Sequence, residues 1–252
     1  MTGGRTTRHG AFTLLEVTLV VGLMVVLAAI VVPNFLRELE RESLPGSARN
    51  LRSLLTLAAA NASFDGKRYR IRFPEEDETD LLGGVRQPII EREDDPIGDP
   101  EAFYPVSAPW AVGHTMLGEV WCAEVRLGRP TIERLRQTRS QVRDALEEGM
   151  EEFEVERLPL VIDPDGTSDW ATFLLTDAPP GTDLDELEQY PRVELIVEGA
   201  TGLAWLQRPF FDEELDLFEE HNWPAVLRQD FLSERILTED DVLELRDLWR
   251  RP

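Results

Sequence analysis

A long apolar run lies close to the N-terminus of the chain. From Val17 to Val32 no residue is charged, and Thr18 is the one side chain that carries a polar group. With the apolar residues on either side, about 20 residues can cross a bilayer, because a helix rises about 1.5 Å per residue and the hydrocarbon core is roughly 30 Å thick. The pattern predicts a transmembrane helix over residues 12–36.

The charges around this run predict its orientation. Arg5 and Arg8 precede it and the first fifteen residues hold no acidic side chain, so the N-terminus is expected in the cytoplasm and the rest of the chain across the membrane. A secretory signal peptide is disfavoured, because the run is too long and no A-x-A-like site clearly follows. A plain signal anchor explains the length but not Glu16, a carboxylate inside the start of the run. Such a group costs several kcal/mol in hydrocarbon, so we expect a cation to pair with it.

A second periodic pattern follows the apolar run. Ala48, Leu51, Leu55, Ala58 and Ala62 recur at spacings of three and four, which predicts an amphipathic helix from about residue 47 to residue 63. We interpret the stripe as core packing under a sheet. The sequence L-P-G at residues 44–46 is expected to kink or interrupt the helix.

Alternating and short apolar segments predict strands in the remaining chain. They are separated by turn sequences such as P-D-G at 164–166, which favours an antiparallel sheet and an α+β fold. Residues 74–109 are acidic and rich in proline and glycine, and are expected to form long loops with a short strand near 85–90. The predicted strands are 67–73, 119–127, 158–162, 170–176, 192–197 and 203–206.

Two further regions are predicted to be helical. Thr131 is the expected N-cap of an inserted surface helix that reaches Glu152. The acidic tail, 209–252, contains six aromatic residues and two expected short helices, 212–220 and 238–250, the second capped by Thr238 with Asp241 three residues on. The tail is either a solvated appendage whose aromatic side chains dock on the sheet, or a surface that binds a partner.

Composition narrows the function further. The formal net charge of −23 makes nucleic acid an improbable partner, because phosphates and the chain repel each other. Cys122 is the single cysteine, which precludes an internal disulfide, and its place in a predicted strand favours a buried apolar role. No metal-ligand spacing, phosphate loop or catalytic constellation is found; Asp163-x-Asp165-Gly166 is interpreted as a turn, not a calcium loop. We therefore expect no catalytic residues, no metal, no cofactor and no enzyme activity.

The segment G-A-F-T-L-L-E, residues 10–16, closely resembles the processing site of type IV prepilins and pseudopilins. In that family a peptidase cuts before a residue that is usually Phe, methylates the new N-terminus, and leaves Glu fifth and a helix-kinking Pro commonly twenty-second. Counting from Phe12 places Glu16 fifth and Pro33 twenty-second. The resemblance implies cleavage between Ala11 and Phe12 and N-methylation of Phe12. Ala11 stands where the family normally has Gly, and a cut after Gly10, the alternative, makes Glu16 sixth.

The resemblance also implies a domain plan and a role for Glu16. Residues 1–11 form a cytoplasmic leader that is removed, 12–36 a transmembrane helix, 37–208 a periplasmic pilin-like domain with a variable insertion at about 74–157, and 209–252 an acidic helical extension. In a filament, the Glu16 carboxylate is expected to pair with the Phe12 ammonium of a neighbouring subunit. Residues 10–73 and about 158–207, which include the motif T-G-L-A-W, are most similar to the minor pseudopilin H group of type II secretion, related to minor pilin T of type IV pili.

The function implied is that of a structural minor pseudopilin in protein export across the outer membrane. It implies an inner-membrane protein with one span, then a pseudopilus subunit, and as partners the prepilin peptidase, other major and minor pseudopilins and the inner-membrane assembly platform. Three alternatives stay open: a minor pilin of a type IV pilus or DNA-uptake system, an unprocessed membrane-anchored periplasmic binding module, and an anchored metal-dependent hydrolase.

Overall fold

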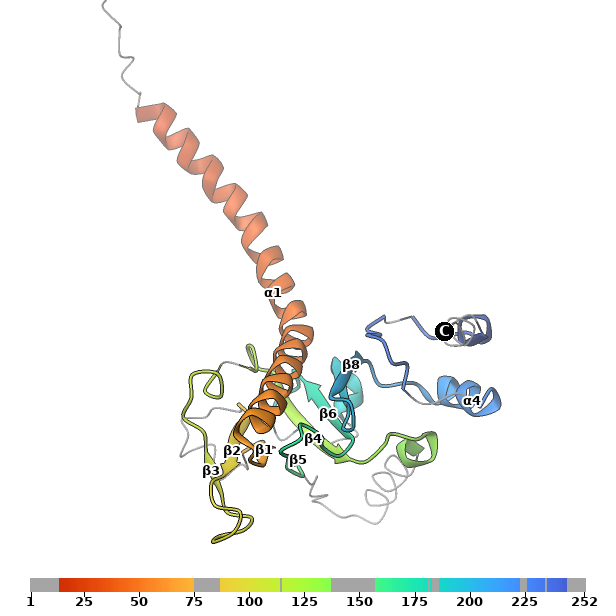
Figure 1. Ribbon diagram of the computed structural model, residues 1–252. Helices are drawn as coiled ribbons and strands as arrows, with labels where there is room; N and C mark the ends of the chain where they lie inside the picture. The colour runs from red at the N-terminus through yellow and green to blue at the C-terminus, as the bar shows by residue number, and fades with distance from the viewer. Residues whose placement is uncertain are drawn as a thin grey trace, which may run out of the picture. The chain divides into compact units, whose positions relative to one another are not determined.

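The computed structural model describes residues 14–74, 87–113, 115–136, 157–180, 182, 186–222, 226–233 and 235–243. The chain divides into two compact units, Met1–Glu42 and Ser43–Pro252. Helix α1 (Leu14–Asp65) contains the described part of the first unit and the beginning of the second (Figure 1).

The second unit starts with the C-terminal part of α1, which buries one face. The predicted amphipathic stripe is confirmed, and all of its members are no more than 6% exposed. The helix assignment is continuous through Pro45 and Gly46, so the expected interruption at these residues is wrong. Neighbouring buried side chains, among them Leu44 and Ala48, pack in the core and stabilise the helix on both sides of Pro45. The predicted stripe consists of Ala48, Leu51, Leu55, Ala58 and Ala62.

The strands form two four-stranded sheets in which every pairing is antiparallel. The first has the order β3-β2-β1-β5, and the second β4-β6-β7-β8. The first sheet comprises β1 (Tyr69–Arg72), β2 (Ile89–Glu93), β3 (Phe103–Pro105) and β5 (Leu160–Ile162). The second comprises β4 (Trp121–Leu127), β6 (Ala171–Thr176), β7 (Arg192–Glu198) and β8 (Leu203–Gln207), with a register shift between Cys122 and Glu124 of β4.

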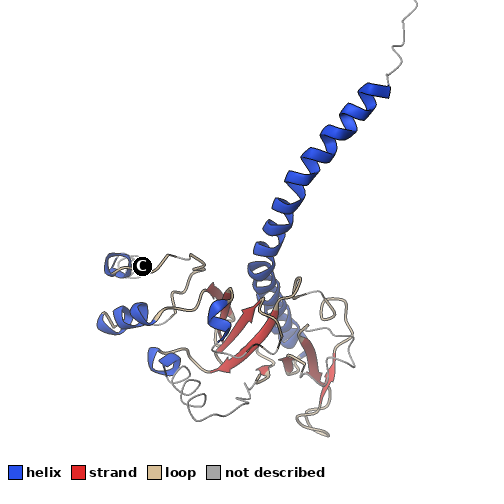
Figure 2. Cartoon of the chain, turned by 180° about the vertical axis from the view of Figure 1, so that it is seen from behind, coloured by secondary structure: helices blue, strands red, loops and turns tan. Residues whose placement is uncertain are grey.

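Both sheets lie beside the C-terminal part of α1 (Figure 2), and all three contribute buried side chains to one main core. Tyr69 and Ile71 of β1 contribute to it from the first sheet, and Phe173 and Leu195 from the second. The rings of Phe73 and Phe173 lie 6.1 Å apart and join the two sheets. The predicted α+β class with antiparallel strands is therefore confirmed.

Glycine turns connect several of these elements where the sequence predicts turns. Gly166 has φ of +84° and donates its N–H to the carbonyl of Asp163 at 2.8 Å, and Gly202 has φ of +67°. Both conformations are accessible to glycine at little cost. Asp165 accepts the N–H and hydroxyl of Thr167, so the 163–166 segment is a turn as predicted.

The tail and the start of the inserted helix form a second, smaller core. Helix α4 (Asp212–Glu220) carries Leu215 and Phe218 into it, and Ile132 and Leu135 pack on it from residues 131–136. Thr131 and Thr238 act as the predicted caps: Arg134 donates to the Thr131 hydroxyl, and Thr238 and Asp241 bond to each other. The remainders of the two predicted helices, 137–152 and 244–250, lie outside the described residues.

Three expectations about the strands and the tail need correction. The strands form two sheets rather than one. The segment 74–109, expected as loops with one strand at 85–90, holds both β2 and β3, and β2 begins at Ile89. The expected docking of the tail aromatics on the sheet holds only in part: Phe210 and Phe218 pack edge to face in the smaller core, with ring centroids 4.9 Å apart, whereas Phe231 pairs with Gln207 of β8. One short 3₁₀ helix, η1 (Glu186–Gln189), precedes β7.

Candidate functional site

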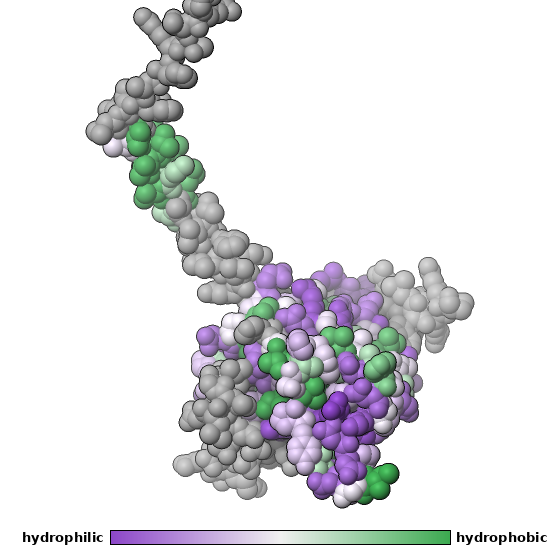
Figure 3. Space-filling view, turned by 60° about the vertical axis from the view of Figure 1, so that its left-hand side comes forward, coloured by the Kyte–Doolittle hydropathy of each residue, from purple (hydrophilic) through white to green (hydrophobic). Residues whose placement is uncertain are grey.

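The N-terminal part of α1 exposes a surface that is apolar on every side. The large side chains from Val17 to Leu27 are each exposed by 42% to 66%. Because successive residues of a helix point about 100° apart, the unbroken series Leu19, Val20 and Val21 covers most of the circumference. The space-filling view shows this stretch as a continuous hydrophobic band (Figure 3). A helix that is apolar all round is normally surrounded by lipid or by other protein.

The residues predicted to direct processing and assembly are only partly covered by the structure. Gly10, Ala11 and Phe12 lie outside the described residues. Glu16 and Pro33 lie within helix α1, and their side chains are not among those described. Among the residues that the structure describes, no helix combines the length and the apolar character needed to cross a membrane. The span over 12–36 and the Pro33 kink remain predictions.

The globular unit contains buried carboxylates that are paired with arginines. On the outer face of the first sheet, Glu93 accepts two hydrogen bonds of 2.6 Å from Arg68, and Glu91 lies within 2.9 Å of guanidinium nitrogens of Arg70 and Arg72. Glu91 and Glu93 are 3% and 1% exposed. The hydrogen bonds from Arg68 lower the pKa of Glu93 against the opposing effect of burial. Because an arginine of β1 or its flanks pairs with each carboxylate, these ion pairs connect β1 to β2.

A similar cluster lies on the second sheet. Arg126 of β4 donates to Glu194 of β7 at 2.8 Å and lies 3.1 Å from Glu124, while Gln207 of β8 donates to the other oxygen of Glu194 at 3.2 Å. Two carboxylates share one guanidinium, and burial raises the pKa of Glu124. The cluster connects β4, β7 and β8 across one face of the sheet.

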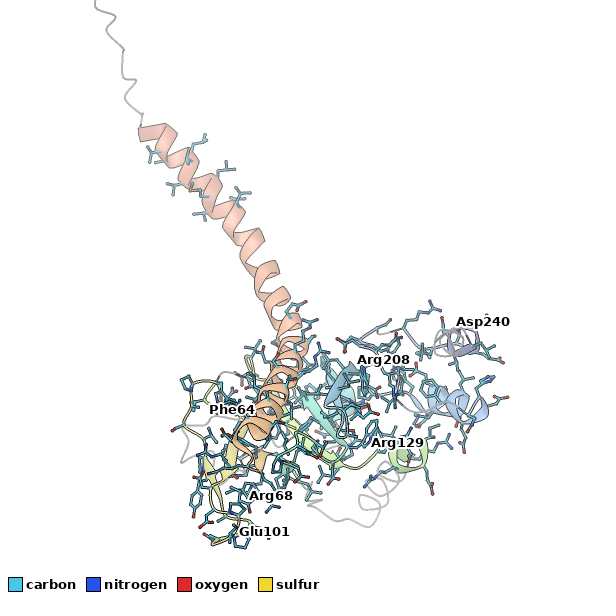
Figure 4. The ribbon with its side chains drawn as sticks, in the orientation of Figure 1. Phe64, Arg68, Glu101, Arg129, Arg208 and Asp240 are labelled. Atoms are coloured by element: carbon cyan, nitrogen blue, oxygen red, sulfur yellow. The ribbon has the colours of Figure 1, made fainter. Side chains whose placement is uncertain are left out.

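A third cluster fixes the tail to the end of β8. Arg208 makes a two-point pair with Glu214, at 2.8 and 2.6 Å, and donates to the carbonyls of residues 209, 233 and 235. Glu214 also accepts the N–H groups of Phe211 and Leu237. The guanidinium of Arg208, which is labelled in Figure 4, is surrounded by aromatic rings. It lies within 5.8 Å of the ring centroids of Phe210, Phe211 and Phe231. These contacts join segments that lie far apart in the sequence.

The remaining candidate chemistry has structural explanations within the described residues. Cys122 is 2% exposed and burial raises the pKa of its thiol, which confirms the predicted apolar role and excludes an easily formed thiolate. In the same part of the chain, no group of three His, Cys, Asp or Glu side chains is arranged to hold a metal ion. Of the three histidines, only His221 is described, and its Nε2 lies 3.6 Å from Glu239.

Sequence reasoning missed the arginine–carboxylate pairs, although one signal for them exists. The segments R-Y-R-I-R and E-R-E place like charges at every second residue, so each strand shows one charged face. Two neighbouring strands with opposite alternating charges are expected to pair. No equally local signal marks Arg208 and Glu214.

Comparisons with known proteins identify no relative of the chain. No protein-family model, curated protein or solved structure matches the chain.

Proposed function

We propose that this chain is a structural, non-enzymatic minor pseudopilin of the type II secretion class, inserted into the inner membrane by the apolar part of α1. The observation that carries the proposal is the exposed apolar surface of Val17–Leu27, directly after a processing-site motif with Glu16 in the fifth position from Phe12. A helix that is apolar all round can contact lipid before assembly and neighbouring helices afterwards.

In this proposal processing creates the cation that Glu16 requires. Cleavage before Phe12 produces an α-amino group near the membrane, and methylation keeps it able to carry a positive charge. In the filament it pairs with Glu16 of an adjacent subunit. The attraction between such charges is much stronger in a medium of low dielectric constant than in water, and pairing offsets the cost of removing both groups from water. The partners are therefore the prepilin peptidase, the other pseudopilins and the assembly platform.

N-terminal mass spectrometry of the protein from cells that contain a prepilin peptidase tests the proposal. We expect a chain that begins with methylated Phe12, and the same mass shift to be absent when the peptidase is deleted. A chain that begins at Ala11 would move the register by one residue. A chain that keeps Met1 would contradict the pseudopilin assignment and favour the unprocessed anchored binding module.

Assembly is tested by substitution of the carboxylate. Glu16→Gln is expected to leave folding and membrane insertion intact but to reduce incorporation into filaments by an order of magnitude or more, because the Phe12 ammonium loses its partner. The matched control is Thr18→Ala, a change of another polar residue on the same helix that removes no charge. Normal incorporation of the Glu16→Gln variant would disprove the pairing. Association of the protein with pilus rather than secretion filaments would favour the type IV minor pilin.

A further inference from the structure

The outer edge of β8 is occupied by the tail of the same chain. Phe231 forms a parallel bridge with Gln207, its N–H donates to the carbonyl of Leu206 at 2.7 Å, and its carbonyl accepts the N–H of Arg208 at 2.9 Å. The N–H of Leu206 donates to Oδ1 of Asp230 at 3.0 Å. The tail thus satisfies the outward backbone groups at this end of β8.

Neighbouring interactions hold this contact in place. Asp230 accepts two hydrogen bonds from Arg52 of α1, at 3.0 and 3.1 Å. Arg208, the residue after β8, is bonded to the carbonyls of 233 and 235 and to Glu214. The segment that covers the edge is therefore attached on both sides, to the helix and to the smaller core.

The other sheet edges carry their own protection against pairing with another chain. β3 and β5 are each three residues long, and β3 ends in Pro105, which has no N–H to donate. β4 has a register shift and two charged residues, Glu124 and Arg126. Short length, proline, irregular register and charge all discourage pairing between sheet edges.

β8 has none of these features. It is five residues long, L-A-W-L-Q, without a charge or proline, and Leu203 at its start is 56% exposed. In an antiparallel sheet the backbone groups of alternate residues point to the same side, so the N–H of Ala204 points outward with those of Leu206 and Arg208. An uncharged edge of this kind is a template for a strand of equal character, and a second β8 is such a strand.

We propose that residues 230–232 are an intramolecular edge cap that prevents β8 from pairing with β8 of a second copy of this chain. When the cap is removed, two copies join antiparallel through Leu203–Gln207. The cap is independent of the function proposed above, because it lies wholly within the globular unit and requires neither processing nor a membrane helix.

The test is a pair of double variants in the full chain, held in detergent micelles. Asp230→Ala with Phe231→Pro removes the carboxylate acceptor and the N–H donor of the cap. The matched control, Asp230→Asn with Phe231→Leu, keeps an acceptor oxygen at 230 and a backbone donor at 231. We expect amide exchange of Leu206 and Arg208 to accelerate by about tenfold or more in the first variant, and by much less in the control.

Self-association is measured by sedimentation, with the wild-type chain in the same detergent as the reference. The uncapped variant is expected to show a species with twice the protein mass of the wild type, in amounts that rise with concentration, whereas the control does not. Adding Ala204→Pro, which removes one outward donor of the edge, is expected to restore the wild-type mass. Three results would overturn the proposal: unchanged exchange at Leu206 and Arg208, an uncapped chain that keeps the wild-type mass, or an associated species that persists after Ala204→Pro is added.

Discussion

Ser47 shows how one polar side chain fixes a long connection to α1. It is fully buried, donates to the carbonyl of Ser43 at 2.7 Å, and accepts the N–H of Leu117 at 2.8 Å. Two residues away from Leu117, the carbonyl of Thr115 accepts from Asn50 of the same helix at 3.2 Å. The segment that leads into β4 is thus attached to the helix by side chains one turn apart.

Ser47→Ala is expected to lower the free energy of unfolding by about 1–3 kcal/mol, because the N–H of Leu117 loses its acceptor in a buried site. Ser53→Ala is the matched control: Ser53 lies on the exposed face of the same helix and donates to the carbonyl of Arg49. Its substitution is expected to change stability by about 0.5 kcal/mol or less. Urea unfolding measures both, and equal effects would contradict the role given to Leu117.

Among the charged residues of the tail, Glu214 is the one whose substitution is expected to lower the stability of the smaller core most. Burial by itself raises the pKa of Glu214, but Arg208 and the N–H groups of Leu237 and Phe211 outweigh burial and hold that pKa below its usual value. Glu214→Gln is expected to destabilise the tail core by about 3–5 kcal/mol at pH 7, because Arg208 is left without a counter-charge in a buried site.

The sign of the pH dependence follows from the lowered pKa. The stability that Glu214 contributes is present above the pKa of the unfolded chain, near 4.5, and is lost as pH falls through the lower pKa of the folded state. The gap in stability between the wild type and the Glu214→Gln variant should therefore narrow below about pH 4.5. Glu213→Gln, which removes a carboxylate at an exposed position of the same helix, is the matched control. A gap that stays constant with pH for Glu214→Gln would refute the linkage.

At the scale of elements, the C-terminal part of α1 has one buried face and one exposed face. Leu51 in the C-terminal part is fully buried, whereas Leu57, six residues later, is 45% exposed. Leu51→Ala is expected to destabilise the globular unit by about 3–5 kcal/mol, from the lost burial and the cavity left in the core. Leu57→Ala removes the same atoms and should cost less than about 1 kcal/mol. Thermal unfolding of both variants measures this difference. Similar losses of stability for Leu51→Ala and Leu57→Ala would mean that the stripe is not the packing face.

The sequence predicts elements best where their pattern is local. The stripe of α1, the strands β4, β6, β7 and β8, and the caps Thr131 and Thr238 follow from spacing within a few residues. β2 was predicted a few residues too early, near 85–90, and β3 was missed. The charged half of β2 depends on pairing, because the buried Glu91 and Glu93 lie opposite arginines of the neighbouring strand. Propensity alone places such charges in a loop.

The contacts of the tail escaped prediction for a related reason. Gln207 and Phe231 lie far apart in the sequence and form a single bridged pair. No periodic pattern of residues in the sequence therefore predicts this bridge. The same holds for Arg52 with Asp230, separated by 178 positions. Of the candidate site, the apolar run was predictable residue by residue. The need of Glu16 for a cation follows from the cost of a carboxylate in hydrocarbon, whereas Phe12 as the source of that cation comes from the resemblance alone.

At the scale of the whole molecule, hydrophobic surface is divided between two units. The main core and the smaller core both consist of residues from Leu44 onward, whereas the described residues of the first unit are exposed. The buried residues of both cores therefore belong to the globular unit. Its surface is strongly acidic, as expected from a formal net charge of −23 in the whole chain.

This division predicts different behaviour for the full chain and for a chain that begins at Ser43. The shorter chain should unfold cooperatively, because it retains both cores, and should enter the aqueous phase in a detergent phase-separation assay. The full chain should enter the detergent phase, because Val17–Leu27 exposes apolar side chains on all sides.

Replacing Val21 and Val25 by Lys in the full chain is the matched test of the helix surface. These two charges, one turn apart, should move the protein to the aqueous phase while the unfolding transition of the globular unit stays unchanged. Retention in the detergent phase would place the lipid-binding surface elsewhere in the chain.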